Sequence, residues 1–351
     1  MNNSKKVYVS VLLIIVLVAF AALSGCSGAS SKQSAAPAGN EGQAQGGQVT
    51  LKLSYPNTET SLTGQAYNYF AKCVEEESKG QIKVQVYPAA SLVSNKDALD
   101  AVRKGNVDIA HFVVSYISPT IKELTPFEVP GAYRGDKYME LDKATHSIVE
   151  KIFAKYGVKY IAPSEQGGTT TFTSMKKLIK SPADLKGLKV RVSGKWIGEA
   201  IKLWGGSPVT IPLGDLPVAL ERNTVDVAYC GWTITGPQKL YETAHYITFT
   251  TLQEIFGGLM MSEKAWNALT KEQQADVQRA AEKLMVYMRD LSAKMKQDTI
   301  DAIKNANGTV YHLTDAENAE FVKATKSLME QVKGISGPEG EELIKSFEAL
   351  Q

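Results

Sequence analysis

Hydrophobic positions along the body of the chain follow two alternating periods. Segments in which every second residue is apolar are typical of strands, and segments with apolar residues three and four apart are typical of helices. The pattern predicts strands at 49–54, 82–86, 107–114 and 158–162, with helices at 63–78, 99–105 and 136–156 between them. Strands separated by helices indicate βαβ units and a mainly parallel sheet. The first half of the body is therefore predicted to be an α/β lobe.

The second half repeats this plan, and one short motif marks the repeat. A strand is expected to open with Val-Asp at Val107-Asp108 and again at Val225-Asp226, each time after a helix and a short turn. Open α/β sheets bind ligands beyond the carboxyl ends of their strands. Two lobes on one plan therefore predict a ligand cleft between two opposed sheet ends. The other elements expected in this half are strands at 169–174, 188–192 and 207–212 and helices at 196–204 and 216–222.

The last hundred residues are expected to connect the lobes. Residues 246–261 are rich in strand formers and should cross between lobes, and residues 271–305 form one helix of on the order of 50 Å that could span both. A strand at 309–313 and helices from Asp315 and Pro338 follow. The expected division is lobe I at 49–168 plus 256–295 and lobe II at 169–255 plus 296–351.

The first 48 residues are expected to stand outside this fold. Lys5 and Lys6 precede an apolar run that is short for a membrane span, which is typical of an export signal at residues 1–25. The run ends in Leu23-Ser24-Gly25-Cys26, which looks like a bacterial lipobox and implies a lipid on Cys26. Residues 26–48 are rich in Ser, Ala, Gly and Gln and are predicted to be a flexible tether. The chain is thus expected to be extracytoplasmic and lipid-anchored.

Charge and motif content exclude several function classes. Loss of the signal would take the formal net charge from +2 to zero, and both signs are interspersed, so no nucleic-acid partner is indicated. The common hydrolase, zinc, dithiol, P-loop and dinucleotide motifs are missing, and the one S-x-x-K, at Ser174, lacks its companions. We expect no enzyme activity, no metal and no cofactor. Cys73 and Cys230 could pair outside the cytoplasm, but two buried free thiols are the simpler expectation.

The alternation in one predicted strand displays an arginine on one face. In the segment SPADLKGLKVRV, Leu188, Val190 and Val192 alternate with Lys189 and Arg191, so one face is apolar and the other carries Arg191. A guanidinium matches a carboxylate with a planar fork of donors, although a solvated charge or an ion-pair partner fits the same pattern. The segment alone leaves these alternatives open.

Three stretches give the chain a family resemblance. It resembles the extracytoplasmic solute receptors of tripartite ATP-independent periplasmic (TRAP) transporters, of the DctP type, over nearly all of 49–350. The stretches are YPAASLVSNKDALDAVRKGNVD at 87–108, IKSPADLKGLKVRV at 179–192 and ALERNTVDVAYCGWTITGPQKLYE within 205–242. The resemblance implies a two-lobed periplasmic-binding-protein-like fold with a ligand cleft between the lobes. It also implies that Arg191 forms a bidentate bridge to a substrate carboxylate.

Other site positions depart from that family pattern. Thr170 stands where many members carry a second arginine, and Tyr229 and Cys230, followed by Trp232, replace a polar pair. Fewer cations and more apolar surface favour a monocarboxylate with an apolar or aromatic body over a C4-dicarboxylate or a sialic acid. Ordinary lobe packing is the alternative for Tyr229 and Trp232. The remaining candidates are Glu165, Gln166 and His111, each with a purely structural alternative, and Leu213.

The resemblance also implies partners. The expected function is capture of a small organic carboxylate and its delivery to small and large membrane subunits of the DctQ and DctM type. A receptor that serves a sensor kinase or an ABC-type importer is the alternative among binding proteins. A surface-anchored enzyme is the alternative from another class.

Overall fold

The computed structural model describes residues 48–164 and 169–350 and shows an α/β protein. The strands are β1 Val49–Ser54, β2 Ile82–Tyr87, β3 Ile109–Val113, β4 Val158–Pro163, β5 Thr170–Ser174, β6 Lys189–Val192, β7 Ser207–Thr210, β8 Val227–Gly231, β9 Tyr246–Phe249, β10 Gly257–Ser262 and β11 Thr309–His312. The α-helices are α1 Leu62–Glu77, α2 Ala98–Lys104, α3 Val114–Ile117, α4 Tyr138–Lys155, α5 Lys195–Leu203, α6 Leu216–Glu221, α7 Trp232–Thr235, α8 Glu263–Ala268, α9 Lys271–Asn305 and α10 Asp315–Glu348. Short 3₁₀ helices are η1 Lys122–Glu128, η2 Gly135–Lys137, η3 Pro182–Leu185, η4 Leu213–Asp215 and η5 Leu240–Glu242. The predicted signal peptide and all but the last residue of the predicted tether lie outside the described residues.

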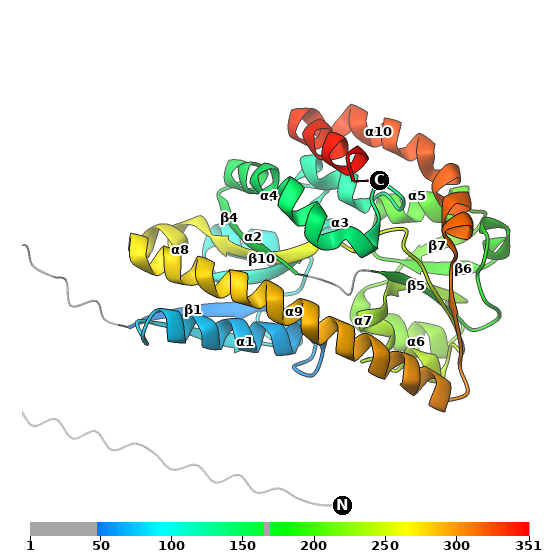
Figure 1. Cartoon of the computed structure of the whole chain (residues 1–351), viewed down its shortest axis with the longest axis horizontal. Helices are drawn as coiled ribbons and strands as arrows, with labels where there is room; N and C mark the ends of the chain where they lie inside the picture. Colours follow the sequence, from blue (N-terminus) through cyan, green and yellow to red (C-terminus); the bar gives the residue numbers. More distant parts are fainter. Residues whose placement is uncertain (1–47, 165–168, 351) are drawn as a thin grey trace, which may run out of the picture. The chain divides into compact units, whose positions relative to one another are not determined.

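The described strands form two sheets, one for each predicted lobe (Figure 1). Sheet A has the order β2-β1-β3-β10-β4, and sheet B has the order β11-β9-β5-β8-β6-β7. The strands of sheet A fall in 49–163 and 257–262, and those of sheet B fall in 170–249 and 309–312. This arrangement confirms the α/β fold with two sheets.

The sheets are mainly parallel, as expected, but each contains one interior strand that runs against all the others. β10 runs antiparallel to both β3 and β4, and β5 runs antiparallel to both β8 and β9. β5 follows the first crossing between the sheets, from β4, and β10 follows the second, from β9. Gly257 at the start of β10 pairs with Val113 at the end of β3, and Thr170 at the start of β5 pairs with Gly231 at the end of β8. A strand that enters a sheet at its neighbours' carboxyl end must run against them.

The two Val-Asp motifs have the same structural role in the two sheets. The Asp108 side chain accepts a hydrogen bond from the Lys52 amide of β1 at 2.8 Å, and Asp226 accepts one from the Lys189 amide of β6 at 2.8 Å. Each carboxylate thus satisfies the amide of a neighbouring strand, and β3 and β8 begin one residue after it rather than at the predicted valine. Each of these strands leads directly into a short helix, α3 or α7. The Val-Asp repeat in the sequence therefore corresponds to the same local structure in both sheets.

Replacing Asp226 with alanine is expected to lower the free energy of unfolding by about 1–3 kcal/mol, because the Lys189 amide loses its buried acceptor. Burial raises the pKa of Asp226, but hydrogen bonds from Lys176 and the Lys189 amide outweigh it and bring the pKa below 3.8. The stabilisation is therefore complete above pH 3.8 and is lost as the pH falls through the lowered value. Urea unfolding at pH 7 and pH 3 measures both effects. Alanine at the exposed Asp215 is the control, and equal midpoints for the two variants would contradict the assignment.

Helix α9 has the predicted bounds because local signals fix both of its ends. Thr270 and Gln273 form a reciprocal capping box at its start, and Asn307 adopts a positive φ of 58° just after its end. The helix contacts α1 and β4 of the first lobe and α7 and β11 of the second (Figure 1). It therefore spans both lobes, as predicted.

Helix α10 also packs on both lobes, although the predicted division assigned it to lobe II. Trp204, at the end of α5, donates from Nε1 to the Phe321 carbonyl at 3.0 Å. Thr325 donates to the Pro130 carbonyl at 2.9 Å, and Glu339 pairs with Lys155 of α4 at 2.6 Å. The two helices predicted from Asp315 and Pro338 are the two halves of α10, which bends at Gly337, where φ is 66°.

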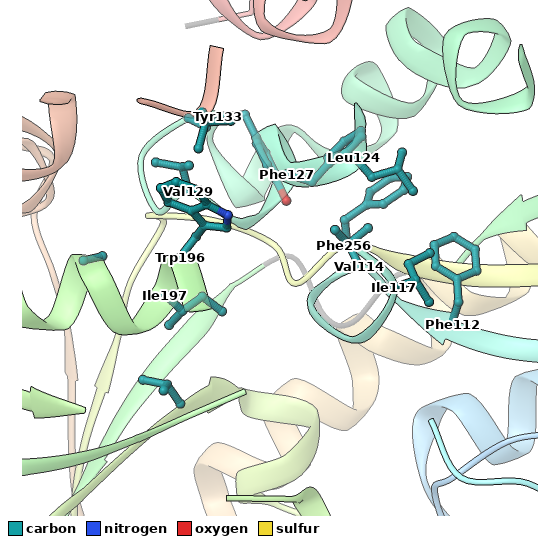
Figure 2. Close-up of a cluster of buried hydrophobic side chains, with 14 of the residues drawn as sticks. Phe112, Val114, Ile117, Leu124, Phe127, Val129, Tyr133, Trp196, Ile197 and Phe256 are labelled. Atoms are coloured by element: carbon teal, nitrogen blue, oxygen red, sulfur yellow. The ribbon is translucent and has the colours of Figure 1, made fainter. Parts of the chain in front are cut away.

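The buried core is continuous between the lobes. Figure 2 shows Trp196 and Ile197 of α5 in the same cluster as Phe127 and Val129, which lie at and just after the end of η1. Trp196 is 7% exposed and Val129 is 0% exposed. The strand that carries Arg191 therefore leads into a helix that is packed against the other lobe.

Candidate functional site

A cavity lies where the carboxyl ends of β3, β6 and β8 come together. His111, Val113 and Tyr116 line it from the first lobe, and Arg191, Ser193 and Cys230 are among the residues that line it from the second. The cavity has a volume of about 50 Å³. It shares several wall residues, including Tyr116, Leu213 and Ile234, with a wider groove of about 560 Å³. This location is the one predicted from the two opposed sheet ends.

Arg191 is a buried cation in the wall of this cavity. Its Nε donates a hydrogen bond to the Ile211 carbonyl at 2.9 Å, and the residue is 3% exposed. Among the described residues, no Asp or Glu oxygen lies within 4.0 Å of its guanidinium nitrogens. A buried charge is costly unless it is paired, so the guanidinium needs an anionic partner.

The local sequence explains why Arg191 is presented in this way. Ser181 and Asp184 form a capping box around η3, which fixes the turn before β6. Val190 and Val192 are buried on one face of the strand, so Arg191 must point to the other. The predicted apolar face and arginine face are both present, and both are buried.

His111 lines the cavity and is hydrogen-bonded inside its lobe as well. Its Nδ1 lies 2.7 Å from the Tyr67 hydroxyl, and the residue is 2% exposed. Burial lowers the pKa of His111 to about 3, so its imidazole is neutral at neutral pH. His111 can therefore offer the cavity a neutral polar edge but no charge.

Tyr229, Thr170 and Trp232 do not line this cavity. Tyr229 and Cys230 are neighbours on β8 and face opposite sides of the sheet, so only Cys230 reaches the cavity. Thr170 donates to the Tyr229 hydroxyl at 3.0 Å and lies 2.7 Å from the Thr250 hydroxyl. Trp232 packs in a buried cluster with Tyr241, Ile247, Phe249 and Ile303. Tyr229 and Trp232 thus have the packing role that was their alternative in the sequence, and Thr170 is hydrogen-bonded inside its own lobe.

The remaining candidates have varied locations. Leu213 of η4 lines both the cavity and the groove. Glu165, Gln166 and the proposed lipid attachment residue Cys26 lie outside the described residues. Cys73 and Cys230 are both buried and both free, so they do not form the disulfide that the sequence left open.

Sequence reasoning missed other wall residues, notably Ser193, Tyr116 and Ile234. Tyr116 and Ile234 occupy equivalent places, each the third residue of the short helix after a Val-Asp strand. Extending the sequence repeat by a few residues would have identified both. Ser193 gave no signal beyond its place two residues after Arg191.

Metal-binding clusters and membrane-spanning helices are absent from the described part of the chain. No group of three or more His, Cys, Asp or Glu side chains there is arranged to hold a metal ion. None of the helices at 48–164 and 169–350 is long and apolar enough to cross a membrane.

Known proteins of one kind resemble the chain over most of its length. The model of bacterial extracellular solute-binding protein family 7, DctP, matches residues 53–334. The 2,3-diketo-L-gulonate-binding periplasmic protein YiaO of Escherichia coli K12 is 24% identical over 307 residues, covering 86% of this chain and 92% of YiaO. The C4-dicarboxylate-binding protein DctB of Bacillus subtilis 168 is 26% identical over 298 residues, covering 83% and 84% of the two chains.

Solved structures of TRAP periplasmic solute-binding proteins share the fold. One from Chromohalobacter salexigens with bound D-glucuronate gives a TM-score of 0.80 at 21% identity, covering 86% of this chain and 100% of that one. One from Sulfurospirillum deleyianum with bound succinate gives 0.77 at 25% identity, covering 87% and 100%. These are two-lobed proteins, which confirms the predicted two-lobed fold. The chain belongs to bacterial extracellular solute-binding protein family 7, the DctP family of TRAP solute-binding proteins.

Proposed function

We propose that this protein captures an organic carboxylate with Arg191 and delivers it to the membrane subunits of a TRAP transporter. The observation that carries the proposal is the buried guanidinium in the cavity wall, which has no carboxylate partner among the described residues. A bidentate pair with a ligand carboxylate would supply a counter-charge. The ligand would also touch both lobes, because His111 and Arg191 line the same cavity.

The shape of the site favours a monocarboxylate with a larger, partly apolar body. The inner cavity holds little more than a small head group, and among its described wall residues Arg191 is the one cation. The wider groove that adjoins it is lined in part by Pro56, Pro212, Leu213 and Ile234, which offer apolar surface to a ligand body.

A C4-dicarboxylate is the alternative ligand, and one observation favours it. Lys96 lines the outer groove and could meet a second carboxylate there. The relatives named above are described as binding a diketo sugar acid, a C4-dicarboxylate, D-glucuronate and succinate, so their ligands include both classes.

Titration calorimetry against a panel of acids tests the proposal. The panel should contain aliphatic and aromatic monocarboxylates, keto acids, D-glucuronate, 2,3-diketo-L-gulonate and succinate. Binding of at least one monocarboxylate, with succinate weaker, is the expected result. A preference for succinate that Lys96→Gln removes would establish the alternative, and no binding by any acid would refute the carboxylate proposal. Turnover of a bound acid would favour an enzyme instead.

The thiol of Cys230 should report whether the cavity is occupied. Burial raises the pKa of the Cys230 thiol, and this effect outweighs the positive charge of Arg191, which lowers the pKa. Slow alkylation by iodoacetamide is therefore expected. A bound acid should slow it at least tenfold further, because Cys230 is in the cavity wall. Mass spectrometry of the alkylated peptides gives the rate. Cys73 is an internal control outside the cavity wall, and equal protection of both thiols would contradict the placement of the ligand.

We also propose that Cys26 carries the lipid that holds the receptor at the membrane surface. The support is the order of charged residues, apolar run, small residues and cysteine in residues 1–26. Metabolic labelling with a fatty acid, compared with Cys26→Ser, tests it. Co-purification with DctQ and DctM type subunits would support transport, whereas a sensor kinase or an ABC-type importer as the partner would support the alternative.

A further inference from the structure

Glu128 is a buried carboxyl group that the proposed ligand site does not use. It ends η1 of the first lobe and is 3% exposed. Its Oε1 accepts a hydrogen bond from the Ser118 hydroxyl, whereas its Oε2 has no hydrogen-bond partner within the described residues. The nearby Ser115 of α3 is 9% exposed, and its hydroxyl likewise has none there. Buried polar atoms are nearly always satisfied, so both atoms call for an explanation.

The two side chains meet the backbone of the second lobe at Gly194. A Cβ atom added to Gly194 would lie 2.7 Å from Glu128 Oε2 and 2.8 Å from Ser115 Cβ. Its φ of −156° and ψ of 177° are open to any residue, so the requirement for glycine here is steric and not conformational. The lobes therefore approach each other at Gly194 closely enough to exclude a methyl group.

This contact adjoins the wall of the ligand cavity on both sides. Along the chain, Ser115 lies between Val113 and Tyr116, and Gly194 follows Ser193. Val113, Tyr116 and Ser193 all line the cavity. Gly194 is also the cap of α5 and lies three residues after Arg191. Any change in the distance between the lobes at this point must move one wall of the cavity relative to the other.

We propose that Ser115, Glu128 and Gly194 form the contact on which the two lobes close, and that Glu128 is a positioning residue that takes up a proton as they close. The Glu128 carboxyl is enclosed only while Gly194 lies against it, and it reaches water when the lobes separate. Protonation gives the enclosed carboxyl a neutral form, which needs no counter-ion. The proposal concerns the lobes and not the identity of the ligand.

The charges around Glu128 determine the direction of the pH dependence. Burial raises the pKa of Glu128 from 4.5 to about 7, against the hydrogen bond from Ser118 and the positive charge of Lys195 on α5. Lys195 is the charged residue that influences it from the facing lobe, and Ser118 is the polar one from its own lobe. The pKa of the Glu128 carboxyl is higher when it is enclosed than when it is exposed to water. Protonation of Glu128 therefore favours closure fully below pH 4.5, and this contribution is lost as the pH rises to about 7.

Cross-linking tests the contact without any ligand. Cysteines introduced as Ser115→Cys and Gly194→Cys should form a disulfide under mild oxidation, because a small separation brings their Cβ atoms to the usual 3.5–4.5 Å. The control pairs Ser115→Cys with Gly198→Cys, one turn further along α5, where an added Cβ would meet Pro208 and Val192 instead. Peptide mapping identifies the bond. The yield of the 115–194 disulfide is compared with the yield of the 115–198 disulfide in the control. Equal yields from folded variants would overturn the contact.

The role of Glu128 is tested by adding Glu128→Gln to the cross-linking pair. The rate of disulfide formation with glutamine, divided by the rate with glutamate, should rise at least tenfold between pH 5.5 and pH 8.5, since thiol chemistry cancels in the ratio. The control is Glu123→Gln on the same 3₁₀ helix. The rate with this variant, divided by the rate with Glu123, should not change with pH. A ratio independent of pH would refute the proton-linked role while leaving the carboxylate proposal intact, and failure of every acid in calorimetry would leave this result unaffected.

Discussion

Replacing Arg191 with lysine is expected to weaken binding of the cognate acid by about 2–5 kcal/mol, or roughly thirtyfold to several thousandfold. Lysine keeps the charge, but it loses the planar pair of donors that matches a carboxylate. It also loses the hydrogen bond from Nε to the Ile211 carbonyl that holds the guanidinium in place. Both losses fall at a site that is 3% exposed, where water replaces them poorly.

Calorimetry with the best acid of the panel measures this effect, and the matched control is Arg222→Lys. Arg222 is exposed at the end of α6 in the same lobe, so its replacement should leave the affinity unchanged. Urea unfolding of the Arg191 variant separates lost binding from lost folding. Unchanged affinity in folded Arg191→Lys would remove the central argument for a carboxylate ligand.

Truncation of Trp204 to alanine is expected to lower the free energy of unfolding by about 3–5 kcal/mol. Its indole is 2% exposed, packs edge to face with Phe172 and Phe321, and donates to the Phe321 carbonyl. Phe321 belongs to α10, so this one side chain joins α10 to the Arg191 lobe. Removing it leaves a cavity and takes one hydrogen bond from the Phe321 carbonyl, which still accepts one from the Thr325 hydroxyl.

Urea unfolding midpoints measure the loss, and two further variants divide it into parts. Trp204→Phe keeps most of the packing and should lose about 1 kcal/mol for the hydrogen bond. Leu203→Ala changes the neighbouring residue, which is 46% exposed, and should stay within about 0.5 kcal/mol of the parent. A Trp204→Ala variant as stable as Leu203→Ala would show that α10 does not depend on this contact.

The lobe contact at Gly194 and the anion site at Arg191 are connected through one short segment. β6 carries Arg191, and the chain then passes Ser193 in the cavity wall and Gly194 at the lobe contact before α5 begins. A ligand that bridges the lobes favours the closed arrangement only by the contacts it gains there. Protonation of Glu128, at the Gly194 contact, acts on the same equilibrium between open and closed lobes.

Short-range signals in the sequence were enough to predict most of the elements. The bounds of α9 follow from a capping box at Thr270 and a turn at Asn307, which involve residues only a few positions apart. The β6 strand follows from the alternation around Arg191, and the repeat follows from Val-Asp in each lobe. Each of these features depends on neighbours along the chain, and the sequence shows those neighbours directly.

Which residues meet across the fold was decided only by the tertiary structure. The sequence could place Arg191 on a strand. It could not show that Arg191 has no carboxylate partner among the described residues. It could not separate Cys230, in the cavity wall, from Trp232, in a buried cluster, although they are two positions apart. Neither the antiparallel β5 and β10 nor the approach of Glu128 to Gly194 has a local signal. The physical reason is that burial, pairing and steric fit depend on partners from distant segments, and periodicity and capping carry no information about those partners.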